Sequence, residues 1–170
     1  MKKCHLLFAG LFLFSMMAAN GQEIFSKGSQ LISLGIGVGA GIPVELSYER
    51  SIVDGLIKKK NGAIGVGAYG GWYHRKLYDW NYNYYVLGAR GAFHYQFVKK
   101  LDTYGGLMLG YSIATASWAG DGESVGTPSG SAFSYSLYIG ARYLFKPRLG
   151  VYAEAGYGIS YLSAGITFKL

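Results

Sequence analysis

Apolar side chains recur at every second position along most of this sequence, and this period of two constrains the fold more than any other feature. The simplest case begins at residue 32, where serine and glycine alternate with four branched residues, Ile32, Leu34, Ile36 and Val38. Successive side chains of a β-strand point to opposite faces, so the pattern predicts a strand with one apolar face and one face of small residues. Comparable alternation predicts eight strands, over residues 32–39, 44–49, 64–73, 85–97, 106–113, 133–145, 151–158 and 162–170.

The composition agrees with strands and excludes two other classes of protein. Glycine accounts for 27 of the 170 residues, and aromatic residues make up 16% of the chain. Glycine in a helix interior costs about 1 kcal/mol relative to alanine, so this content argues against a mainly helical protein. Hydrophobic residues make up 51% and charged residues only 15%, a balance that excludes a disordered chain.

The first 21 residues have the features of a secretory signal peptide. Two lysines precede an apolar run that ends at Ala19, and the small residues Ala19 and Gly21 suit a cleavage site. A membrane-spanning helix needs about 20 apolar residues, more than this run contains. We therefore expect residues 1–21 to be removed and residues 22–170 to form one domain. The single cysteine, Cys4, would leave with the signal, and the loss of two lysines would lower the formal net charge from +7 to +5.

The second face of the predicted strands decides between a soluble barrel and a membrane barrel. That face consists mainly of glycine, serine, alanine and tyrosine with isolated charges, whereas a soluble barrel would present many charged residues to water. Small residues suit the lumen of an eight-stranded barrel, which is just wide enough for side chains. The apolar face suits lipid, and strands cross a bilayer only in a closed barrel. The predicted fold is all-β: an eight-stranded antiparallel up-and-down transmembrane β-barrel.

The final strand carries the sequence Ala164-Gly165-Ile166-Thr167-Phe168-Lys169-Leu170. With the signal peptide, the eight alternating strands and the short turns on one side, it resembles the small outer-membrane barrels of Gram-negative bacteria, the OmpX and OmpA barrel-domain group. The resemblance implies a monomer in the outer membrane, in contact with lipids and lipopolysaccharide, without an appended domain. It also implies insertion by the barrel assembly machinery, with Phe168 as the aromatic residue of the assembly signal.

The predicted lumen face carries six charged side chains of balanced sign, and we expect them to form a network: Glu45, Glu49, Arg90, Arg142, Glu154 and Lys169. If Phe145 and Val151 face each other across their hairpin, Arg142 lies directly opposite Glu154. Opposite charges that face each other across two strands stabilise the pairing. Two interpretations remain open: the pairs fix the barrel structurally, or they form a salt-bridge gate in a narrow channel of low conductance.

The predicted connections differ between the two ends of the barrel. Basic residues gather in the connections on the N-terminal side, where they would solvate turns or attract anionic head groups: Lys58, Lys59, Lys60, Lys99, Lys100, Lys146 and Arg148. Aromatic residues crowd the predicted loop 75–83 and the start of the next strand at the opposite end: Tyr78, Trp80, Tyr82, Tyr84 and Tyr85. They would form an interfacial girdle or a contact patch for a protein or glycan.

The sequence does not favour an enzyme or a cofactor. Outer-membrane lipid A deacylases place a histidine and a serine two residues apart on one strand face, and neither His74 nor His94 has a serine at that spacing. A cluster with metal-ligand spacing is not found, and an exported protein is not expected to bind nucleic acid. We therefore expect a structural or surface-interaction role, with a narrow channel as the alternative and a lipid A-modifying enzyme as a distant third.

Overall fold

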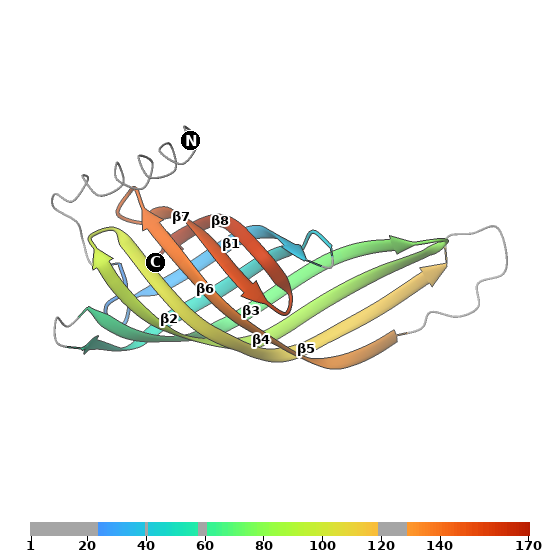
Figure 1. The fold of residues 1–170 in the computed structure, drawn as a ribbon, viewed down its shortest axis with the longest axis horizontal. Helices are drawn as coiled ribbons and strands as arrows, with labels where there is room; N and C mark the ends of the chain where they lie inside the picture. Colours follow the sequence, from blue (N-terminus) through green and yellow to red (C-terminus); the bar gives the residue numbers. More distant parts are fainter. Residues whose placement is uncertain (1–23, 40, 58–60, 119–128) are drawn as a thin grey trace, which may run out of the picture.

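Eight antiparallel strands close into one barrel, as the alternation predicts (Figure 1). The computed structural model describes residues 24–39, 41–57, 61–118 and 129–170, so the predicted signal peptide and the lysines at 58–60 lie outside the described residues. Each strand pairs with its neighbours in sequence, and the last pairs with the first. The strands are β1 (Gln30–Gly39), β2 (Val44–Leu56), β3 (Gly62–Leu77), β4 (Trp80–Val98), β5 (Leu101–Trp118), β6 (Ser129–Leu144), β7 (Leu149–Tyr157) and β8 (Ser160–Lys169). Within the described ranges, no helix is both long and apolar enough to cross a membrane.

The barrel wall is much taller on one side than on the other. Strands β3 to β6 have 16, 19, 18 and 16 residues, whereas β7, β8 and β1 have 9, 10 and 10. We call the end that holds Gln30 and Lys169 the terminal end, and the opposite end the distal end. Figure 1 shows β4, β5 and β6 reaching far past β7 and β8 at the distal end. We call the part of this wall formed by residues 73–84, 114–118 and 129–130 the distal extension.

The loop predicted over residues 75–83 is instead a strand hairpin, so this expectation was wrong. Strand β3 continues to Leu77 and β4 begins at Trp80, which leaves only Tyr78 and Asp79 in the turn. Aromatic residues favour strands because their rings pack across the pleated surface. The rings of Tyr73 and Tyr84, opposite each other on the two strands, stack with centroids 4.6 Å apart.

The two faces of the wall have the chemistry that the sequence predicts. Leucine, isoleucine, valine and aromatic side chains cover the outer face, including Leu34, Leu107 and Ile139. Small and polar residues fill the lumen, where glycines leave room for the large rings. At Gly140, for example, an added Cβ would lie 2.7 Å from the ring of Tyr104. The lumen is therefore a packed interior with few voids.

The hairpin between β6 and β7 differs from the predicted register. Tyr143 faces Val151, so Arg142 faces Tyr152 and Glu154 faces Gly140, which means that Arg142 and Glu154 are not opposite each other. Lys146 and Leu149 exchange two backbone hydrogen bonds around a two-residue turn, with N···O distances of 3.0 and 3.3 Å. The pairing then resumes at Leu144 and Gly150, which moves β7 by two residues relative to the expectation. A shift of two keeps every side chain on its predicted face.

Candidate functional site in the barrel lumen

The charged residues of the lumen form two separate groups. The group nearer the terminal end, which we call the terminal cluster, consists of Glu49, His94, Asp102 and Arg142, each at most 2% exposed. His94 Nε2 lies 2.8 Å from Glu49 Oε1, and its Nδ1 lies 2.9 Å from Asp102 Oδ2. The Arg142 guanidinium lies 3.3 Å from both carboxylates. Four strands, β2, β4, β5 and β6, are thereby joined across the lumen.

Both nitrogens of the His94 ring face a carboxylate oxygen. An ionised carboxylate can only accept hydrogen bonds, so with both carboxylates ionised each ring nitrogen donates one and His94 is an imidazolium. Two cations, His94 and Arg142, then balance two anions, Glu49 and Asp102. Such balance matters here, because a buried charge without a partner is far more costly than a paired one.

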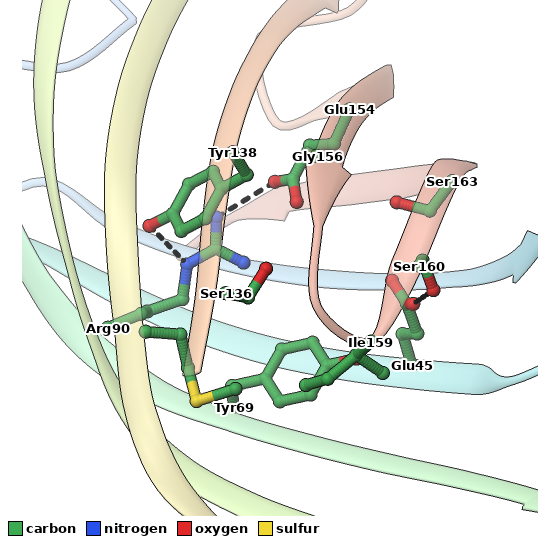
Figure 2. Close-up of a pocket in the computed structure, with 11 residues that line it drawn as sticks. Glu45, Tyr69, Arg90, Ser136, Tyr138, Glu154, Gly156, Ile159, Ser160 and Ser163 are labelled. Carbon is green, nitrogen blue, oxygen red and sulfur yellow. Dashed lines mark hydrogen bonds and ion pairs between the residues drawn. The ribbon is translucent and has the colours of Figure 1, made fainter. Parts of the chain in front are cut away.

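A second group lies further towards the distal end. It pairs Arg90 with Glu154, and we call these two residues the middle pair. Arg90 Nη2 lies 2.8 Å from Glu154 Oε1, and the hydroxyl of Tyr104 donates to the same oxygen at 2.8 Å. Arg90 Nε donates to the Tyr138 hydroxyl at 3.0 Å, and its guanidinium lies 4.2 Å from the centroid of that ring. Figure 2 shows this arrangement, with the guanidinium between Tyr138 and Glu154.

The segment that precedes β1 covers the terminal cluster. Phe25 stacks on the His94 ring with centroids 3.9 Å apart, and it packs with Leu31 and Ala63. Gly65 leaves space for this ring, since a Cβ there would lie 2.8 Å from Phe25 Cζ. Ile24 is 1% exposed. We call residues 24–29 the N-terminal cap, because they close the lumen at the terminal end.

A small cavity of about 20 Å³ lies at the distal end of the lumen, beside the middle pair. We call it the distal chamber. Its polar lining comes from the middle pair together with six other side chains: Glu45, Tyr69, Ser136, Tyr138, Ser160 and Ser163. Figure 2 shows Ser160, Ser163 and Glu45 on one side of the chamber, with the ring of Tyr69 reaching towards them. The Ser160 hydroxyl donates a hydrogen bond to Glu45 Oε1.

The structure brings together five of the six charged residues that the sequence places in the lumen, but in different combinations. Arg142 pairs with Glu49 and Asp102, and Glu154 pairs with Arg90. The sixth residue, Lys169, lies half-buried near the end of β8, opposite Leu31. It is not a member of the terminal cluster or of the middle pair.

Sequence reasoning missed two members of the terminal cluster. His94 lies on the predicted lumen face, but it was considered only as a catalytic residue. Asp102 lies outside the strand predicted over residues 106–113, whereas β5 begins at Leu101 and places Asp102 opposite Arg142. The alternation Asp102, Tyr104, Gly106 continues the lumen face of β5 towards the terminal end, and this signal could have identified Asp102.

The five aromatic residues predicted as one patch are divided between two faces and a turn. Trp80, Tyr82 and Tyr84 share the lumen-side face of β4 with Arg90, because they lie at even spacing from it, whereas Tyr85 points outwards. Tyr78 lies in the turn and is 87% exposed. Ring contacts extend the lumen-side group to neighbouring strands, and we call the complete set the aromatic face: Tyr73, Trp80, Tyr82, Tyr84 and Trp118.

Three other sequence candidates remain apart from these groups. Phe168 lies on the outer face of β8, opposite Ile32 of β1, and its role in assembly stays a prediction. His74 is exposed in the distal extension, where its Nδ1 lies 3.3 Å from Asn83 Oδ1. Among the described residues, no three histidine, cysteine, aspartate or glutamate side chains gather so that they could hold a metal ion.

No protein-family model matches the sequence, and no curated protein matches it. Solved structures do share its fold. Ail of Yersinia pestis, in complex with the heparin analogue sucrose octasulfate, has a TM-score of 0.52 at 15% identity, over 85% of this chain and 96% of that one. The N-terminal barrel domain of Pseudomonas aeruginosa OprF has a TM-score of 0.52 at 15% identity, over 85% and 98% of the two chains. Neisserial surface protein A has 0.51 at 15% identity, over 84% and 94%. The chain therefore has the fold of the small eight-stranded outer-membrane β-barrels.

Proposed function

We propose that this protein is an integral outer-membrane barrel with a closed lumen, and that its role is structural or lies in contacts at the cell surface. The observation that carries the proposal is the filling of the lumen. The N-terminal cap, the terminal cluster and the middle pair succeed one another along the barrel, and their side chains occupy its interior. A role that depends on transport through the lumen would require all three to move.

The outer wall supports a location in lipid. Apolar side chains cover it, and an eight-stranded barrel with such a wall is the form in which strands can cross a bilayer. Membrane lipids and lipopolysaccharide are then the expected neighbours. We expect a monomer, because β1 pairs with β8 and the ring closes within one chain. The terminal end would face the periplasm and the distal extension would project outside the cell.

The aromatic face is the best candidate for a contact surface. Aromatic side chains supply large contact areas at low cost in conformational entropy and dominate many interfaces. This face lies on the distal extension, beyond the distal ends of the short strands β7, β8 and β1. We propose that it contacts a glycan or protein outside the cell. The structure of Ail with a heparin analogue is one example of the same fold with a glycan-like ligand.

Planar-bilayer recording tests the closed lumen. The purified, refolded protein should give no single-channel steps, and Arg142→Ala should also stay closed, because the cap and the middle pair remain in place. Heat-dependent migration on a gel shows that each variant is folded. Steps from the unaltered protein that change on Arg142→Ala would contradict a closed barrel and favour the narrow, gated channel.

A further inference from the structure

Glu45 differs from the other carboxylates of the lumen. It is 5% exposed and lines the distal chamber, yet no ion pair in the described part of the chain joins it to a cationic side chain. Glu49, Asp102 and Glu154 each have such a partner. The Ser160 hydroxyl donates a hydrogen bond to Glu45, and the hydroxyls of Tyr69 and Ser163 lie beside the same carboxylate.

An ionised carboxylate buried without a counter-charge is strongly destabilised. The nearby charges do not relieve Glu45, because Arg90 is already 2.8 Å from Glu154, and Glu154 itself repels a second anion. With Glu45 ionised, the distal chamber therefore holds one negative charge in excess. Either a proton or a bound cation must compensate it.

The lining of the distal chamber favours a cation over a proton. Ser160, Ser163 and Tyr69 surround the carboxylate with hydroxyl oxygens, which are the ligand type that hard cations prefer. The Tyr69 hydroxyl is buried beside Glu45, yet among the described residues it makes no hydrogen bond of normal geometry, although a buried hydroxyl normally makes one. A cation bound between the Tyr69 hydroxyl oxygen and the Glu45 carboxylate would give that hydroxyl a coordination partner.

The volume of the chamber and the charge of Glu45 determine which ion fits. A volume of about 20 Å³ admits one particle of the size of a water molecule, since a water needs roughly 10–15 Å³ by the same measure. Gly37 of β1 preserves this space, because a Cβ there would lie 2.8 Å from Glu45 Oε1. A single positive charge neutralises Glu45, whereas a divalent ion would leave a buried excess of one. We propose that the distal chamber binds one Na⁺ ion, with Glu45 as its anionic ligand and the hydroxyls of Tyr69, Ser160 and Ser163 as neutral ligands.

The dependence of stability on Na⁺ tests this site. The protein, refolded in uncharged lipid vesicles, is unfolded with urea in NaCl and in N-methyl-D-glucamine chloride at equal ionic strength. A ligand that binds only the folded state raises the unfolding midpoint. The midpoint should therefore rise with Na⁺ and level off, and it should become insensitive to Na⁺ in Glu45→Gln. Asp79→Asn, which alters an exposed carboxylate in a turn, should keep the full dependence.

A second variant and a direct measurement keep the test decisive if Glu45→Gln does not fold. Ser163→Ala removes one neutral ligand and should shift the Na⁺ dependence to higher concentration. The ²³Na resonance should broaden in the presence of the unaltered protein and lose that broadening on addition of excess Li⁺. At the same Na⁺ concentration it should broaden less with Ser163→Ala. Equal midpoints in the two salts would overturn the proposal. So would a stability that changes with pH at Glu45 but not with Na⁺, because the chamber would then hold a proton or a water molecule.

Discussion

At the scale of single residues, the contact between Phe25 and His94 decides how the terminal cluster is protected. Without the N-terminal cap, the lumen that holds these four charged side chains would open towards water at the terminal end. The attraction between the charges is strong only while water is excluded. Phe25 lies flat against the His94 ring and is 7% exposed itself. One side chain of the N-terminal cap thus separates the cluster from the aqueous side.

A cysteine reporter measures this separation, since the chain without its predicted signal contains no cysteine. Ala63 is 2% exposed beneath Phe25, so A63C should resist a water-soluble maleimide in the folded barrel. Adding Phe25→Ala should make the same site react at least tenfold faster. Phe97→Ala, which removes an outward-facing ring near the same end, serves as the matched control and should leave the site protected. Equal reactivity in all three proteins would show that the cap does not seal the lumen.

At the scale of elements, the distal extension exists because β3 and β4 continue as paired strands beyond the short wall. The register runs without interruption from Gly62 and Tyr95 to Leu77 and Trp80. Consecutive residues of a strand point to opposite faces, so two aromatic residues that are adjacent in the sequence belong to different surfaces. Tyr84 belongs to the aromatic face, and Tyr85 belongs to the outer wall.

This division gives a matched pair of variants for the proposed contact with glycans. The solubilised protein should bind a subset of glycans on an array, and Tyr84→Ala should reduce that binding at least tenfold, because it removes the ring that stacks on both Tyr73 and Tyr82. Tyr85→Ala should keep it. Loss of binding in both variants, or in neither, would mean that the aromatic face is not the contact surface.

At the scale of the whole molecule, an exposed apolar side chain contacts lipid or water depending on where it lies on the barrel wall. Leu107 and Leu77 are both 46% exposed. Leu107 lies on the outer face of β5 in the part of the wall that is closed all round. Leu77 lies at the tip of the distal extension, opposite Trp80 and on the same face of the wall as the aromatic face. In water the two positions would be equivalent, but in a bilayer only Leu107 faces hydrocarbon.

An arginine at each position therefore reports whether the barrel spans a membrane. Arginine on the lipid face near the middle of a bilayer costs about 2–4 kcal/mol, and close to nothing near the interfaces. Leu107→Arg should lower the free energy of unfolding in lipid vesicles by about that amount, and Leu77→Arg should leave it almost unchanged. Tryptophan fluorescence during urea unfolding measures both. Equal effects of the two substitutions would contradict a membrane-spanning wall at Leu107.

The faces of the strands could be predicted from the sequence, but the partners across the lumen could not. Period-two alternation assigns Glu49, Arg90 and Arg142 to the lumen because side-chain direction is a local property of a strand. Which charges meet depends on the register of every hairpin and on the closure of β8 against β1. The two-residue displacement at the turn after β6 moved Glu154 away from Arg142. The register of β5 against β6 placed Asp102 opposite Arg142, and closure of the barrel brought Glu49 of β2 to the same guanidinium.

The sequence by itself determined the number of strands, their order and the chemistry of each side of the wall, since all three follow from local alternation and from the solvent that each face requires. Only the tertiary structure decided that Phe25 covers His94, that β3 to β6 form a tall distal extension, and that Glu45 lines a chamber in which Arg90 pairs with Glu154. These features depend on contacts between strands that are distant in sequence. Their geometry is set when the barrel closes, and no local pattern encodes it.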